Sequence, residues 1–207
     1  MTLSAILKQV GASLITRDGK AIDWPLIEAV TQEVADAWPK SEENPMDISA
    51  FPVEQHGDLT FQAERLADIV EEMRVMHELH WRETEVYRHA LQLNFDYERV
   101  IAYEKAGRYV LFTIRKDGKL VGNFAAYLTR STHTQSLMAT EDTLYVVPEL
   151  RGRGIAKLFH NYIEKIFVGL GAKEIIVTVK KVNSTGKLLE HWGFQHVAEQ
   201  YVKVIGG

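Results

Sequence analysis

The spacing of apolar residues predicts two helices near the start of the chain. Over residues 3–14 and 23–37 the apolar positions fall three or four apart, which is typical of amphipathic helices. A polar, proline-bounded segment at 39–45 follows and indicates a linker. We therefore expect a helical N-terminal extension over residues 1–47 and a second domain over residues 48–207.

The second domain begins with one strand and two helices. Residues 48–55 predict a strand, and Pro52 restricts it to a sheet edge because proline cannot donate to a ladder. Apolar residues then recur with a period near 3.6 over 60–80 and over 96–106. Both stretches predict amphipathic helices.

A β-meander is expected from residue 109 onward. Strands at 109–115 and 120–129 flank Asp117-Gly118, and an Asp-Gly pair between two apolar runs is typical of a tight hairpin. Residues 135–147 predict a third strand.

The clearest helical stripe follows the meander. It consists of Ile155, Leu158, Phe159, Tyr162, Ile163, Ile166 and Phe167. After it we expect a buried strand at 175–179, a short helix at 183–192 and a final strand at 197–204.

Composition places the chain among folded globular proteins, because 46% of its 207 residues are hydrophobic and 25% are charged. The sequence contains no cysteine, which excludes disulfides, thiolate nucleophiles and cysteine-ligated metals. His77 and His80 share a helix face with Glu83 one turn on, but this set is too small to predict a metal site. We expect no metal.

The net charge of −4 conceals an asymmetry between the two halves of the chain. Residues 1–107 carry 10 basic and 20 acidic side chains, whereas residues 108–207 carry 14 and 8. We expect the basic half to bind an anion, while the acidic half either attracts a cation or presents solvated helix faces. The basic residues are not interleaved with aromatic ones, which argues against nucleic acid as a partner.

Targeting signals are not evident in the sequence. The N-terminus lacks the basic and apolar regions of a signal peptide. No stretch approaches the roughly 18 apolar residues of a spanning helix. We expect no membrane partner and a cytoplasmic location.

A glycine-rich segment, Arg151-Gly152-Arg153-Gly154, joins the third strand of the meander to the striped helix. Glycines let a backbone approach a ligand closely, and the first N–H groups of a helix attract phosphate. The alternative is a plain turn that starts a helix. Lys157 stands where a dinucleotide-binding loop has its third glycine, so that loop is excluded.

The pattern R-x-x-G-x-A at Arg151, Gly154 and Ala156, after a strand that ends at Pro148, resembles the coenzyme A pyrophosphate loop of the GNAT superfamily of N-acetyltransferases. The order of meander, loop, long helix, strand, short helix and Gly-Phe pair also resembles that fold over residues 48–207. Residues 77–81 and 141–145 resemble GNAT-like proteins encoded by bacteriophages. The resemblance implies an α/β (α+β) fold in which helices flank a mixed, mostly antiparallel twisted sheet.

The same resemblance implies acetyl-CoA as the cosubstrate and assigns residues to it. Those expected to bind the pyrophosphate are Arg151, Gly152, Arg153, Gly154, Ile155 and Ala156. The backbone of Leu144, Tyr145 and Val146 is expected to pair with the pantetheine arm. Asn183 either touches that arm or is a plain helix cap.

Two adjacent acids are the candidates for the base that must deprotonate an amine acceptor. Asp142 stands where the family often has its carboxylate, and Glu141 is its neighbour. Strand alternation places only one of them in the cleft, and we favour Asp142; the alternative is a solvated or salt-bridged acid. The family's usual tyrosine acid is replaced by Leu189, which leaves the general acid open.

The nearby His191, His196 and Tyr201 are more typical of surface or core positions than of a general acid. His80, Trp81 and Glu83 either line the mouth of the acceptor site or are ordinary helix-surface residues.

We therefore expect an acetyl-CoA-dependent N-acetyltransferase that attacks directly within a ternary complex, because without cysteine no cysteine acyl-enzyme can form. The expected acceptor is a cationic primary amine, either a small molecule or a protein lysine. The alternative is a catalytically idle GNAT-like protein that binds acetyl-CoA or has a structural role. In that case residues 1–47 contact a protein partner or a second copy of the chain.

Overall fold

The computed structural model describes residues 46–85, 91–182 and 185–203. The helices expected within residues 3–37 and the linker at 39–45 lie outside this part, as does nearly all of the 1–47 extension.

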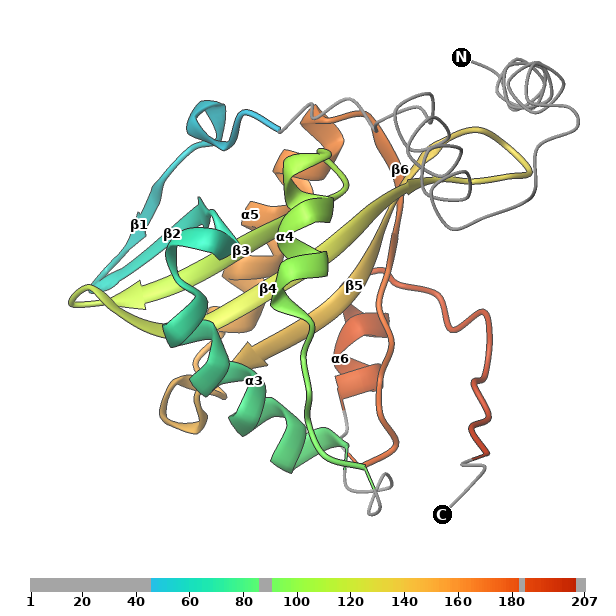
Figure 1. The fold of residues 1–207 in the computed structure, drawn as a ribbon. Helices are drawn as coiled ribbons and strands as arrows, with labels where there is room; N and C mark the ends of the chain where they lie inside the picture. The colour runs from blue at the N-terminus through green and yellow to red at the C-terminus, as the bar shows by residue number, and fades with distance from the viewer. Residues whose placement is uncertain (1–45, 86–90, 183–184, 204–207) are drawn as a thin grey trace, which may run out of the picture. The chain divides into compact units, whose positions relative to one another are not determined.

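Six strands form one sheet whose spatial order follows the chain (Figure 1). They are β1 (Glu54–His56), β2 (Leu59–Glu64), β3 (Tyr109–Lys116), β4 (Lys119–Arg130), β5 (Leu137–Val146) and β6 (Ala172–Ile176). Neighbours are antiparallel from β1 to β5, whereas β5 and β6 are parallel. The expected mixed, mostly antiparallel sheet is confirmed.

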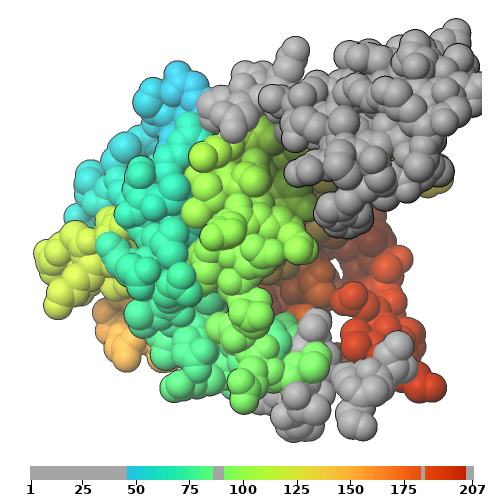
Figure 2. Space-filling view, in the orientation of Figure 1, coloured from blue at the N-terminus to red at the C-terminus, as the bar shows by residue number. Residues whose placement is uncertain are grey.

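Helices cover both faces of this sheet. The α-helices of the described residues are α3 (Val70–Thr84), α4 (Tyr97–Lys105), α5 (Ile155–Gly169) and α6 (Thr185–His191). Helices α3 and α4 lie on one face and α5 on the other (Figure 1). In the space-filling view α3 and α4 lie side by side over the sheet (Figure 2). The α+β layering therefore creates two cores, one on each face.

The core under α5 is rich in aromatic side chains and confirms the predicted stripe from Phe159 to Phe167, whereas Leu158 is exposed. Phe159, Tyr162 and Phe167 are each about 1% exposed. Phe112 of β3 packs edge-on against Tyr162 and Phe167, with ring centroids 6.0 and 5.6 Å apart. Such pairs add about 0.5–1.5 kcal/mol beyond area burial, so α5 is firmly fixed to the sheet.

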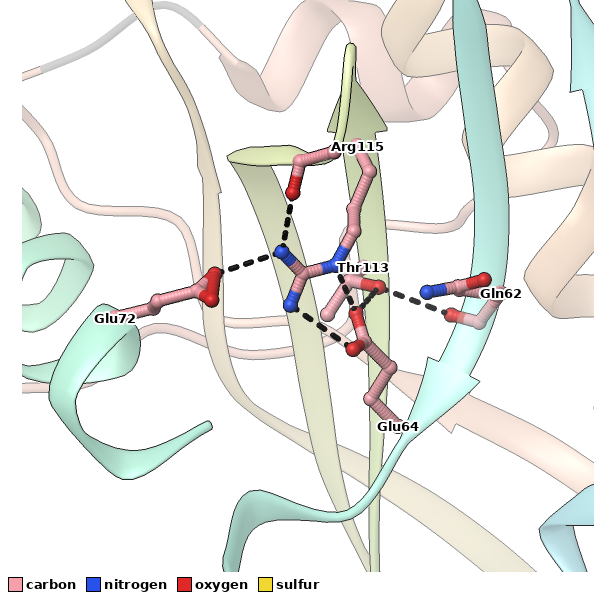
Figure 3. A network of polar contacts seen from close by, with 6 residues as sticks. Gln62, Glu64, Glu72, Thr113 and Arg115 are labelled. Atoms are coloured by element: carbon pink, nitrogen blue, oxygen red, sulfur yellow. Dashed lines mark hydrogen bonds and ion pairs between the residues drawn. The ribbon is translucent and has the colours of Figure 1, made fainter. Parts of the chain in front are cut away.

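The predicted hairpin between β3 and β4 is confirmed. Asp117 and Gly118 both have positive φ, 48° and 79°, as a type I′ turn requires. Arg115 stabilises this turn through a network of polar contacts (Figure 3). Its Nε and Nη2 donate to the two oxygens of Glu64 at 2.8 and 2.9 Å, and its Nη1 donates to Glu72 and to the Gly118 carbonyl, both at 2.7 Å. One guanidinium thus joins β2, β3 and α3.

The helix predicted over 60–80 is wrong in its first part. Residues 59–64 form β2, which pairs with β3 along its whole length, and α3 begins only at Val70. Residues 48–55 are likewise not one strand, because Ile48–Ala50 is a 3-10 turn and β1 is limited to Glu54–His56.

The C-terminal elements differ from the prediction. Strand β6 (Ala172–Ile176) begins and ends three residues earlier than the strand expected at 175–179, and it is not buried as expected, since each of its residues is half-buried or exposed. Helix α6 agrees with the short helix expected at 183–192. The final strand is wrong over its described part, since residues 197–203 are not in a strand. No helix in the described ranges has both the length and the apolar character needed to cross a membrane.

Candidate functional site

The parallel strands β5 and β6 diverge halfway along β5. Their pairing runs from Leu137 to Thr140 of β5 and stops at Thr140–Ile176. On its other side β5 stays paired with β4 as far as Val146. Residues 141–146 therefore present an edge without a strand partner among the described residues, and such an edge offers backbone N–H and C=O groups to a ligand. The edge contains Leu144, Tyr145 and Val146, which were predicted to bind pantetheine.

A β-bulge lies at the point of divergence. The register between β4 and β5 steps from Ala125–Thr143 to Ala126–Glu141, so Asp142 has no direct partner. Bulges re-aim side chains, and here two consecutive acids point to different partners. Glu141 accepts a hydrogen bond from the backbone N–H of Thr178 at 3.2 Å, whereas Asp142 accepts one from the hydroxyl of Tyr109 at 3.0 Å.

Glu141 spans the gap between the separating strands, because Thr178 lies just beyond the end of β6. Burial is the main cause that raises the pKa of Glu141 to about 7, and the negative charges of Asp142 and Glu85 act in the same direction. The Thr178 N–H and the positive charge of Lys180 oppose this rise. Glu141 can therefore exchange a proton near neutral pH.

Asp142 is hydrogen-bonded to Tyr109, which is buried in the core that α3 and α4 form with the sheet. Burial raises the pKa of Asp142, and the hydrogen bond from Tyr109 counteracts it. The two acids that the sequence singled out thus lie together at the divergence, one across the gap and one beside it.

The glycine loop lies directly after the open edge. Gly152 and Gly154 have φ of 75° and 76°, and nothing lies within 4 Å of the position that a Cβ would take on either glycine. Gly154 caps α5 and no side chain caps that helix end. The first N–H groups of α5, including those of Ile155 and Ala156, have no acceptor within the helix. A phosphate fits at this helix end, since the N–H groups and the helix dipole both favour an anion.

Arg151 is held by the protein itself. Its Nε donates to the Val146 carbonyl at 2.8 Å, and its two Nη atoms donate to the carboxylate of Glu83 at 2.7 and 2.9 Å. The guanidinium also lies over the Tyr145 ring, 5.2 Å from its centroid. Arg151 therefore ties the loop to β5 and to the end of α3, while Arg153 stays exposed.

The end of α3 borders the divergence from the other side. Glu85, which caps α3, forms an ion pair with Lys180 at 2.9 Å. The His80 ring packs edge-on against Tyr145, with centroids 6.1 Å apart. Burial lowers the pKa of His80, and the negative charges of Glu85 and Glu83 oppose this shift. Glu85 and Lys180 were not predicted, because no spacing in the sequence relates these two positions.

The remaining candidates lie elsewhere. Leu189 is buried, 6% exposed, and is aliphatic. His191, His196 and Tyr201 are exposed, and the Tyr201 hydroxyl donates to Glu199. Asn183 lies outside the described residues. His77 is buried on α3, where its Nδ1 is 2.9 Å from the Tyr97 hydroxyl oxygen. Its role is therefore in packing and not in the candidate site.

Comparison with known proteins found one matching family profile and several solved structures with a similar fold. Residues 73–194 match the profile described as "Acetyltransferase (GNAT) family". A solved aminoglycoside acetyltransferase from an uncultured soil metagenomic sample, in complex with sisomicin, is similar at a TM-score of 0.55 and 16% identity, over 72% of this chain and 96% of that one. A ribosomal-protein-alanine N-acetyltransferase from Brucella melitensis biovar Abortus 2308 gives 0.56 and 19%, over 72% and 99%.

A predicted acetyltransferase with acetyl-CoA from Clostridium acetobutylicum is similar at a TM-score of 0.53 and 12% identity, over 71% of this chain and 96% of that one. At such identities the likeness establishes the fold alone. A comparison with curated proteins found no match.

Proposed function

Because this chain belongs to the acetyltransferase (GNAT) family, as its match over residues 73–194 shows, we propose that it transfers the acetyl group of acetyl-CoA directly to a primary amine. The observation that carries the proposal is the junction of two features: the open edge of β5 runs straight into a glycine loop at the start of α5. A long ligand with an amide-rich arm and a pyrophosphate matches these two features in that order.

Backbone groups make most of the proposed contacts with acetyl-CoA. The N–H groups of α5 beyond Gly154 receive the pyrophosphate, and the exposed Arg153 adds positive charge beside them. The open edge at Leu144–Val146 pairs with the amides of the pantetheine arm. Arg151 acts as a positioning residue, since its guanidinium is already committed to Glu83 and the Val146 carbonyl.

Glu141 is the proposed general base. An ammonium acceptor has to lose a proton before it can attack, and a base works best when its pKa is near the working pH. What supports Glu141 over Asp142 is its location across the gap, next to Thr178, together with a pKa of about 7. Asp142 has the supporting role of a second negative charge that helps to keep this pKa raised.

Leu189 cannot donate a proton, so the proposed reaction uses no tyrosine acid at that position. A thiol has a pKa of about 8.5, which makes the thiolate of coenzyme A a fairly stable leaving group that solvent can protonate. Attack is direct, because the chain has no cysteine to carry the acetyl group.

The proposed acceptor is a cationic amine. Both the aminoglycoside acetyltransferase and the ribosomal-protein-alanine acetyltransferase are named for amine-bearing substrates. Glu85, at the border of the divergence, already binds an ammonium group, that of Lys180. The cytoplasmic location expected from the sequence remains a prediction.

Calorimetric titration with acetyl-CoA tests the binding half of the proposal. Wild type should bind, and Gly154→Trp should not, because a side chain there enters the space left for the pyrophosphate. Gly171→Trp is the matched control at the other end of α5, where φ is 79° and the surroundings are equally open. If the wild type does not bind acetyl-CoA, the proposal is wrong.

A turnover assay distinguishes an active acetyltransferase from a protein that binds acetyl-CoA without catalysis. The second possibility is supported by Leu189, which stands where the family usually has a tyrosine acid. Release of coenzyme A thiol is measured with a panel of polyamines, aminoglycosides and lysine peptides. Amine-dependent release supports an acetyltransferase. Binding without release across the panel supports a protein that only binds acetyl-CoA.

A further inference from the structure

An ion pair links the segment that follows β6 to the end of α3. Lys180 belongs to the segment after β6, and its Nζ is 2.9 Å from Oε1 of Glu85 at the end of α3. The two side chains are 25% and 10% exposed. The ion pair therefore connects the two elements that border the divergence.

The backbone of Lys180 is close to the proposed base. Thr178, two residues earlier, donates its N–H to the Glu141 carboxylate at 3.2 Å. The lysine ammonium stabilises the charged form of Glu141 and disfavours that of His80, which are electrostatic effects that require proximity. Lysine has a flexible four-carbon stem, so a change of rotamer carries its Nζ from Glu85 toward Glu141.

This placement gives Lys180 what an acceptor amine needs. It is an ammonium group held by a carboxylate, next to a base with a proton affinity suited to neutral pH, beside the edge that receives the thioester. Lys181, its neighbour, is exposed and is not among the groups that act on Glu141. The two adjacent lysines thus differ in environment.

We propose that Lys180 is a self-acetylation site, at which the chain transfers an acetyl group from acetyl-CoA to its own Lys180 side chain. This inference rests on the proposed function, since it uses the same bound thioester and the same base. Glu141 takes a proton from the Lys180 ammonium, and the neutral Nζ attacks the acetyl carbonyl carbon. A C–N bond forms, the C–S bond breaks, and the nitrogen gives up its second proton to solvent as the neutral amide forms. Coenzyme A leaves as the thiolate, which solvent protonates.

Acetylation ends the bridge between α3 and the segment after β6. The amide on acetylated Lys180 carries no charge and cannot form an ion pair with Glu85. Glu85 is largely buried, so loss of the Lys180 charge removes a favourable interaction from its carboxylate. We therefore expect α3 and the segment after β6 to be held together less tightly in the modified chain.

Peptide mass spectrometry after incubation with isotope-labelled acetyl-CoA tests the inference. In wild type the label should appear on Lys180 well before it appears on exposed lysines such as Lys181. Its rate should be independent of protein concentration, as expected for transfer within one molecule. Glu141→Gln should slow the labelling of Lys180 by about 100-fold and leave Lys181 unchanged.

Two matched variants complete the test. Lys180→Arg keeps the charge beside Glu85 and should abolish labelling at this position, whereas Lys181→Arg should leave Lys180 labelling intact. Equal labelling of Lys180 and Lys181, with no effect of Glu141→Gln, would be direct chemical acylation and would overturn the inference. A rate that rises with protein concentration would overturn transfer within the molecule.

Failure of this inference is distinguishable from failure of the proposed function. If calorimetry shows acetyl-CoA binding and amines release thiol while Lys180 stays unlabelled, only the self-acetylation is wrong. If acetyl-CoA does not bind, both are wrong.

Discussion

Replacing Glu141 with glutamine should make the protein more stable and less active at the same time. The amide keeps an oxygen for the Thr178 N–H and removes the charge. In the folded chain the pKa of Glu141 rises from its ordinary 4.5 to about 7. Each pKa unit corresponds to about 1.36 kcal/mol, so ionised Glu141 destabilises the fold by about 3 kcal/mol relative to its protonated form.

The sign of the pH dependence follows from this raised pKa. Folded wild type binds the Glu141 proton more tightly than the unfolded chain does, and the resulting stabilisation is complete below pH 4.5. It is lost as the pH rises through about 7. Urea unfolding should therefore show wild type losing about 3 kcal/mol between about pH 5 and pH 8 relative to Glu141→Gln. Asp142 titrates in both proteins, so its contribution cancels in the comparison.

Activity should move in the opposite direction. Thiol release in the presence of an amine should fall by about 10² to 10⁴-fold in Glu141→Gln, since general-base catalysis is worth that much. The acidic limb of the wild-type pH profile, near pH 7, should disappear. The exposed Glu190→Gln serves as the control for loss of one carboxylate. A glutamine variant no more stable than wild type at high pH would refute the electrostatic reasoning, and one with an unchanged pH profile would refute the assignment of the base.

Three further predictions concern the groups around the site. Arg115→Met should lower the free energy of unfolding by about 2–3 kcal/mol in urea titrations, because it leaves the half-buried carboxylate of Glu64 without its cationic partner. An unchanged midpoint of the urea transition would show that Arg115 does not stabilise the fold. Arg151→Lys should weaken acetyl-CoA binding about tenfold in calorimetry, because lysine cannot form the two-pronged contact with Glu83. Tyr109→Phe should cost about 1–2 kcal/mol at neutral pH, since it removes the hydroxyl donor from the buried Asp142 carboxylate, and thermal unfolding at low pH should show a smaller difference.

Local signals predicted the elements that local interactions form. Asp117-Gly118 fixes its hairpin through backbone conformation alone, and the α5 stripe is buried from Phe159 to Phe167. Residues 60–64 were mistaken for helix because Phe61 fits a helical period with the apolar residues of α3. Its inward direction is set instead by pairing with Ile114 of β3, more than fifty residues away, which no local window contains.

The backbone conformation of the glycine loop could be predicted from the sequence, whereas the arrangement of the acids beside it could not. Glycines at a strand-to-helix junction are visible as letters, and their positive φ follows. The roles of Glu141 and Asp142 depend on the bulge between β4 and β5 and on where β6 stops pairing. Lys180 and Glu85 meet only because α3 and the segment after β6 both reach the divergence. These are properties of non-local pairing and cannot be derived from residue spacing.

The order of the strands also bears on how the molecule assembles. Strands β1 to β5 are neighbours in space in the order in which they are synthesised, and all of their pairings are antiparallel. Each of these strands can dock on an edge that already exists, with α3 and α4 inserted between β2 and β3. Strand β6 has to wait, since a parallel pair requires a crossover, and here α5 must form and pack first. Because β6 can pair with β5 only after α5 has formed and packed, we expect the two sides of the divergence between β5 and β6 to meet late in folding. A nascent chain stalled before Ala172 would then hold a nearly complete sheet that cannot yet enclose its ligand.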